Sequence, residues 1–140
     1  MRIGEACALE WKDVDFDKEQ IVVYKTLNYT KIYYDDHGKR LSEPYYTVQI
    51  TTPKRTASNR IIPMNKQTRN AFLSWKEKQD IDKIHSNWGK KNKLLDKYPG
   101  LVFTSKLGNC FLPVSASKEC KRICSIANCT YFTQNYTFNF

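Results

Sequence analysis

Arg2 and Glu5, three residues apart at the start of the chain, are the first side chains whose types and spacing could do chemistry. Two residues at this spacing lie on one face of a helical turn, where the carboxylate can hold the guanidinium in a fixed pose. A guanidinium held in this way is suited to a phosphate group, which it can bind through two parallel hydrogen bonds. An ordinary helical ion pair is the alternative, and at a protein surface such a pair contributes little to stability.

Lys54 and Arg55 form a second candidate group, in the polar loop 51–59 that precedes a short predicted strand over 60–63. Either side chain could contact a polyanion, and a lysine can also donate a proton. The alternative is that both are solvated surface residues, as most basic side chains are.

The charge of the chain is distributed unevenly. The formal net charge is +9, but residues 1–50 hold seven basic against nine acidic side chains, whereas residues 51–140 hold sixteen against five. A one-sided excess of this kind favours a polyanionic partner, most often nucleic acid. A solvated, lysine-rich surface is the alternative interpretation. The side chains that we expect to contact DNA are Arg55, Arg60, Lys90, Lys91 and Lys93.

The sequence predicts neither a metal site nor a membrane segment. The five cysteines form no Cys-x-x-Cys pair, and Cys120 and Cys124, four residues apart, have no histidine nearby in sequence that would complete a zinc site. We expect reduced, partly buried thiols, no metal and no cofactor. The chain has neither a long apolar run nor a signal-like start, which predicts a soluble bacterial protein of the cytoplasm.

Three segments have the composition of short strands, and together they predict a small antiparallel sheet: residues 20–27, 45–50 and 60–63. In the second strand, Tyr46, Val48 and Ile50 would share one face because side chains alternate along a strand. Pro63 would end the third strand, since proline cannot donate to a sheet ladder.

Helices are predicted on both sides of these strands. Asn65 is suited to cap a long helix from Lys66 to about Ser86, which would pack on the sheet through Phe72 and Trp75. Ser115 would cap a last helix, with an inner face formed by Cys120, Ile123, Cys124 and Ala127. The other predicted elements are a helical remnant over 1–10, turns at 13–17 and 35–38, and a short strand at 101–103. The expected fold class is α+β, a three-stranded antiparallel sheet packed against helices.

The order of these motifs resembles the catalytic domain of the tyrosine recombinases, the integrases of phages and conjugative transposons. Their first motif reads approximately Thr-Gly-(small or Met)-Arg-x-x-Glu-(small)-x-x-Leu-x-Trp, and the chain matches it from Arg2 to Trp11. The family's catalytic lysine lies on a hairpin ahead of an Arg-x-Ile-Pro motif, and Lys54 and residues 60–63 occupy those places. Residues 101–104 resemble the short apolar strand ahead of the family's second catalytic motif.

The resemblance implies a division of roles in DNA strand cleavage. Arg2 would bind the scissile phosphate and neutralise the charge that grows on its oxygens. Lys54 would act as general acid toward the departing 5′-hydroxyl, with Arg55 as a rival for that role. Glu5 would orient Arg2 without touching the substrate. Double-stranded DNA and other recombinase protomers are the implied partners.

The second half of the family's motif set has no counterpart in the chain. The family continues with His-x-x-Arg, then His or Trp, then a tyrosine that bonds covalently to the DNA 3′-phosphate. His37 and His85 head no such motif, and Tyr131 and Tyr136 follow the last predicted helix too closely to serve as that nucleophile.

We therefore interpret the chain as a truncated recombinase catalytic domain over residues 1–128, with an unstructured or read-through tail over 129–140. It would derive from an interrupted integrase gene of a mobile element and would be inactive on its own. The alternative is a non-catalytic DNA-binding module that occupies recombination sites.

Overall fold

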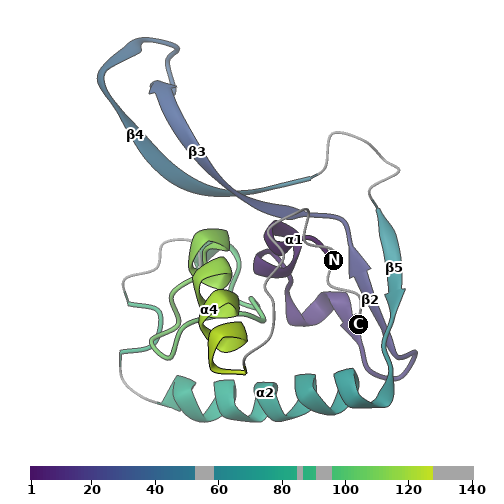
Figure 1. Ribbon diagram of the computed structural model, residues 1–140. Helices are drawn as coiled ribbons and strands as arrows, with labels where there is room; N and C mark the ends of the chain where they lie inside the picture. Colours follow the sequence, from purple (N-terminus) through teal and green to yellow (C-terminus); the bar gives the residue numbers. More distant parts are fainter. Residues whose placement is uncertain (53–58, 85–86, 91–95, 128–140) are drawn as a thin grey trace.

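Helices and two antiparallel sheets make up the structure, a computed structural model that describes residues 1–52, 59–84, 87–90 and 96–127 (Figure 1). The expected α+β fold class is confirmed. In chain order the elements are α1 (Ile3–Cys7), a 3-10 turn (Trp11–Asp13), β1 (Val14–Asp15), β2 (Gln20–Val23), β3 (Thr26–Tyr34), β4 (Arg40–Thr51), β5 (Arg60–Pro63), α2 (Lys66–Ile84) and α4 (Pro113–Ile126).

A three-stranded antiparallel sheet in the order β1-β2-β5 forms the centre of the body. Ile21 pairs with Val14 on one side and with Ile62 on the other. The predicted three-stranded sheet is therefore present, but one of the three strands assigned to it was wrong. Residues 45–50 are not part of it, and its third strand is β1, which lies within the segment 13–17 that was predicted to be only a turn.

The strands β3 and β4 form a separate two-stranded arm that rises from the body (Figure 1). Its base pairs Thr26 with Thr51, and its tip is the predicted turn at Asp35–Gly38, where Gly38 has a φ of 77°. The segment 28–44, between the first two predicted strands, is thus itself largely strand. The predicted strand 20–27 is divided, since β2 ends at Val23 and β3 begins at Thr26.

The helix α2 runs beneath the body sheet and closes the main core (Figure 1). Asn65 caps it as predicted, because the Asn65 Oδ1 accepts a hydrogen bond of 2.8 Å from the backbone N–H of Thr68. Phe72 is buried, and Trp75 packs beside it while its Nε1 donates to the carbonyl of Val102 at 2.7 Å. Both predicted anchors are therefore confirmed. The predicted end of the helix near Ser86 lies just outside the described residues.

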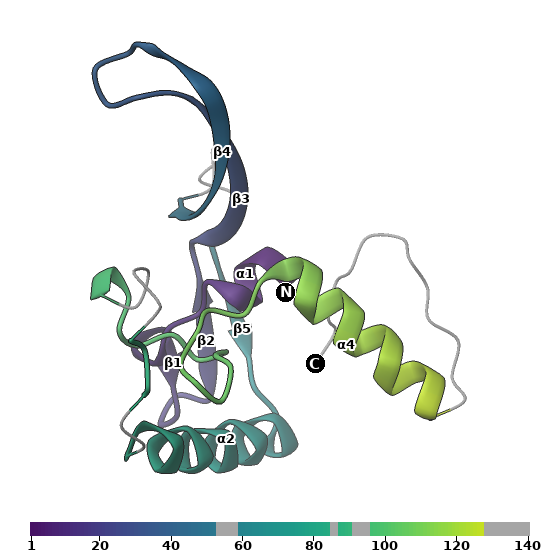
Figure 2. The same ribbon diagram turned by 90° about the vertical axis from the view of Figure 1, so that its left-hand side faces the viewer.

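Residues 101–104 and the last helix depart from the predictions. The expected strand 101–103 is reduced to isolated bridges, one between Leu101 and Glu10 and one between Thr104 and Cys110. The last helix begins at Pro113 rather than after Ser115, because proline at the first helical position needs no hydrogen bond from its nitrogen. Figure 2 shows that α4 projects away from the body, and the helix has no buried residue, so the predicted inner face is only partly covered.

Candidate functional site

Arg2 lies at the start of α1 with its side chain in solvent, 74% exposed. Met1, just before it, and Cys7, at the end of α1, are packed into the two core clusters of the molecule. The α1 turn is also closed by the carboxylate of Glu5, which accepts a hydrogen bond of 2.6 Å from the backbone N–H of Arg2. A turn this short would fray in isolation, and these contacts are what hold it.

The Glu5 carboxylate binds the Arg60 guanidinium more closely than it binds that of Arg2. Arg60 donates two hydrogen bonds, of 3.1 Å to Oε1 and 2.7 Å to Oε2, whereas the guanidinium of Arg2 lies 4.0 Å from Oε1. Burial alone would raise the pKa of Glu5, but the hydrogen bonds from Arg60 and from the backbone of Arg2 outweigh it, so the pKa is lowered. Glu5 is therefore a buried anion that joins α1 to β5.

This pairing was missed by the sequence reasoning, which assigned Arg60 to DNA contact and Glu5 to the guanidinium of Arg2. The bidentate geometry is the strong form of an arginine–carboxylate pair. It places Arg60 in a structural position with its side chain 35% exposed, and leaves the Arg2 guanidinium as the more accessible of the two.

The loop that carries Lys54 and Arg55 is anchored at both ends next to α1. Lys54 and Arg55 themselves lie outside the described residues. At the first end, Thr51 pairs with Thr26 in the arm, and at the second end Arg60 is held by Glu5. The structure thus brings the two ends of this loop to the α1 turn that presents Arg2.

A hollow of about 600 Å³ lies beside Arg2. One wall is the start of α1, a second is the base of the arm with Asn28 and Tyr29, and a third is the first turn of α4 with Ser115. The exposed guanidinium of Arg2 is the charged group on its lining. The hollow therefore offers space for a ligand next to a permanently positive side chain.

Of the other predicted DNA-contacting lysines, the structure describes Lys90 alone. Lys90 is exposed, and its Nζ lies 3.3 Å from the Asn87 side-chain oxygen. Lys91 and Lys93 lie outside the described residues. Lys90 is therefore available to a polyanion, but the structure does not bring it together with Arg2.

A buried ion cluster beneath the site was also missed. Lys25 is 6% exposed and donates to the carboxylates of Glu10 and Asp13, the second at 2.7 Å between Lys25 Nζ and Oδ2. Tyr24 completes it by donating to Asp13 Oδ1 at 3.0 Å. Burial lowers the pKa of Lys25, but its two carboxylate partners outweigh that effect and raise it. The cluster fixes the chain where β2 passes into β3.

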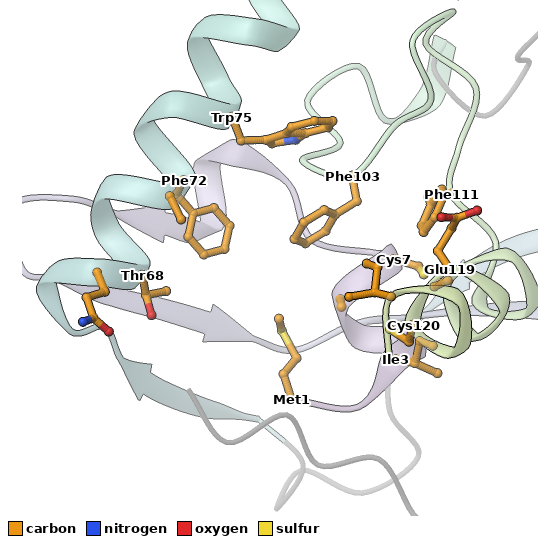
Figure 3. Close-up of a pocket in the computed structure, with 15 residues that line it drawn as sticks. Met1, Ile3, Cys7, Thr68, Phe72, Trp75, Phe103, Phe111, Glu119 and Cys120 are labelled. Carbon is orange, nitrogen blue, oxygen red and sulfur yellow. The ribbon is translucent and has the colours of Figure 1, made fainter. Parts of the chain in front are cut away.

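An apolar groove of about 590 Å³ lies on another side of α1, between α1, α2 and α4. Figure 3 shows aromatic side chains from α2 and from the segment before α4 turned toward it, among them Phe72, Phe103 and Phe111. Cys7 borders the groove, and burial raises the pKa of its thiol to about 12, which makes it an unreactive core thiol. The groove offers mainly apolar packing surface, and the free thiol of Cys120 also lines it.

The described residues contain no cluster of three or more His, Cys, Asp or Glu side chains that could hold a metal ion. In the same part of the chain, no helix has both the length and the apolar character needed to cross a membrane.

Comparison with known proteins finds one sequence relative and several solved structures of similar fold. No family model matches the chain. The chain is similar to a protein named tyrosine recombinase XerC-like from Caldanaerobacter subterraneus subsp. tengcongensis, with 28% identity over 131 residues. The match covers 94% of this chain and 32% of that relative, so the chain spans about a third of the relative's length.

Solved structures show the same fold. The Tn1549 transposon integrase in complex with a circular intermediate DNA matches with a TM-score of 0.63 and 23% identity, over 96% of this chain and 38% of the integrase. The same integrase in complex with transposon right end DNA matches with a TM-score of 0.62 and 24% identity, over 91% of this chain and 34% of the integrase. XerA recombinase matches with a TM-score of 0.51 and 17% identity, over 97% of this chain and 34% of that chain.

Proposed function

We propose that this chain, which belongs to the tyrosine recombinase family, supplies the arginine–lysine half of a DNA strand-cleavage site. The observation that carries the proposal is the α1 turn, which presents an exposed Arg2 while both ends of the Lys54 loop are anchored beside it. Relatives of this fold have been solved as integrases in complex with DNA.

In this proposal Arg2 binds the scissile phosphate in the hollow beside α1. A guanidinium fixed in advance stabilises the charge that grows on the phosphate oxygens without reorganising during the reaction. Lys54 donates a proton to the departing 5′-hydroxyl. Glu5 acts through the backbone of Arg2 and through Arg60, and touches no substrate.

Binding is tested by titrating duplex DNA at several salt concentrations. Because phosphate contacts release counterions, affinity should fall steeply as salt rises, and Arg2→Ala should weaken binding and reduce the slope of log affinity against log salt by about one. Lys18→Ala is the matched control, since its side chain is also 74% exposed but lies in the acidic half of the chain. If the affinity for duplex DNA is the same at low and moderate salt, or if the chain binds no DNA, the basic half is only a solvated surface.

Catalysis is a separate question, and we propose that the chain alone does not cleave DNA. It has no counterpart of the His-x-x-Arg motif or of the tyrosine nucleophile, so no covalent step is available. A nicked suicide duplex with an integrase core site should give no protein–DNA adduct. An adduct that disappears in Tyr131→Phe or Tyr136→Phe would contradict this.

The alternative, a non-catalytic module that occupies recombination sites, is favoured by the same missing motifs. The two functions are separated by supplying the missing part of a recombinase domain in trans. Restored cleavage that depends on Arg2 and Lys54 supports the cleavage half-site, and binding without any restored cleavage supports the module.

A further inference from the structure

The glycine inside the Arg2–Glu5 turn lies unusually close to the arm. A Cβ added at Gly4 would lie 2.6 Å from Thr26 Oγ1 and 3.0 Å from the backbone carbonyl oxygen of Leu27. Real Cβ atoms essentially never approach other heavy atoms to less than 3.0 Å. Rotation of the Thr26 side chain could relieve the first contact, but the second is with the backbone and needs a strand to move.

Gly4 is not required by its backbone conformation. The described glycines with positive φ are Gly38, Gly89 and Gly108, and Gly4 is not among them. Inside a helix, glycine is less favourable than alanine by about 1 kcal/mol. We attribute the glycine in this five-residue helix to the close approach of α1 to β3, which leaves no room for a side chain.

The strand that Gly4 touches is the one that begins the arm. Thr26 and Leu27 are the first residues of β3, and Thr26 pairs with Thr51, the last residue of β4 and the start of the Lys54 loop. The other end of that loop is bound by Glu5, the next residue along from Gly4. The position of α1 against β3 therefore sets where both ends of the loop lie relative to Arg2.

We propose that Gly4 is a positioning residue, whose missing side chain sets the distance between Arg2 and the two described ends of the Lys54 loop, Thr51 and Arg60. The expected effect of Gly4 on DNA binding rests on the proposed function. Its effect on the position of α1 against β3 does not. Gly4→Ala should displace α1 from β3, weaken the Glu5–Arg60 pair and misplace Arg2 relative to the loop.

The geometric part is tested without DNA, by NMR titration of the Glu5 carboxyl in the full chain. In Gly4→Ala the midpoint should move upward toward the ordinary glutamate pKa of about 4.3. The double variant Gly4→Ala/Thr26→Ala removes the hydroxyl but leaves the contact with the Leu27 carbonyl oxygen, so it should return the midpoint only in part. Gly100→Ala is the matched control, because a Cβ at Gly100 would meet its nearest neighbour at an ordinary 3.7 Å. An unchanged midpoint in Gly4→Ala, or an equal shift in Gly100→Ala, would overturn the inference.

If Gly4→Ala does not fold, the same titration of Glu5 is carried out on Thr26→Val. This variant replaces the hydroxyl of Thr26 with a larger methyl group, which would press on Gly4 from β3. It should shift the Glu5 midpoint in the same direction by less, and no shift would overturn the inference.

The functional part is tested by duplex affinity, which Gly4→Ala should lower by about 3- to 10-fold. If the wild-type chain binds no DNA, the proposed function fails and the NMR titration still decides the geometry. If the wild-type chain binds and Gly4→Ala binds equally well despite a displaced α1, the positioning role is wrong and the proposed function stands.

Discussion

Around Lys25 the protein buries charge, whereas along α4 it exposes apolar side chains. Lys25, Glu10 and Asp13 are 6%, 4% and 4% exposed, and among the described residues every buried side-chain nitrogen or oxygen has a hydrogen-bond partner. Ile123 and Ile126 on α4 are 56% and 71% exposed. In the first region, groups within the chain satisfy every buried charge, so the junction between β2 and β3 should hold its shape without a partner. The second region contributes little packing to the body.

The largest loss of stability is expected when Lys25 is replaced. Lys25→Met would leave two buried carboxylates without their shared cation, which typically costs about 3–5 kcal/mol in the free energy of unfolding. Urea denaturation measures it. Lys12→Met is the matched control, because Lys12 also binds Glu10, at 2.9 Å, but is 65% exposed and should cost less than about 1 kcal/mol. Equal losses in the two variants would mean that burial does not distinguish these lysines.

A smaller effect, with a pH signature, is predicted at Glu5. At pH 7, Glu5→Gln should lower the free energy of unfolding by about 1–3 kcal/mol, because it removes the negative charge from a carboxylate that accepts three hydrogen bonds. The pKa of Glu5 is lower in the folded state, so its stabilisation is present above the unfolded-state pKa and is lost as pH falls through the folded pKa. The gap between wild type and variant should therefore close below about pH 4.5.

The control for Glu5 is Glu119→Gln, a half-exposed partner of Arg122 on α4. It should change the stability little at any pH. A gap for Glu5→Gln that stays constant from pH 7 to pH 3 would show that the carboxylate is not preferentially charged in the folded state.

The smallest effect is predicted on α4. Ile126→Ser should change the free energy of unfolding by no more than about 0.5 kcal/mol, since the side chain is already in solvent. Ile21→Ala, at a side chain that is 1% exposed, should cost about 2–5 kcal/mol in the same measurement. A large loss for Ile126→Ser would show that this face is covered in solution, and light scattering would then test for self-association.

Local patterns in the sequence predicted the elements whose evidence lies within a few residues. Asn65 and the Phe72–Trp75 stripe fixed the start and the packing face of α2, and the turn at Asp35–Gly38 lies at the tip of the arm. The Arg2-x-x-Glu5 motif located the helical turn and pointed to the family.

What the sequence could not predict depends on pairings between distant segments. Strand composition does not say which strand pairs with which, so residues 45–50 were placed in the body although they pair with β3. The same limit hid the Glu5–Arg60 pair, whose members are 55 residues apart. Lys25 resembled any lysine in a strand, because nothing local shows that two carboxylates converge on it.

The arm has a consequence for how the chain folds. The pairing of Val23 with Arg60 closes a loop that contains the whole arm, and the entropy cost of closing a loop grows with its length. The arm is a hairpin with its own turn, and hairpins form within microseconds. Once Thr26 lies opposite Thr51, the ends of β2 and β5 are already close, so the hairpin turns a distant encounter into a local one. Strand pairing is thereby expected to begin at the turn Asp35–Gly38 and to proceed along the arm toward Arg2. The body sheet would then form last.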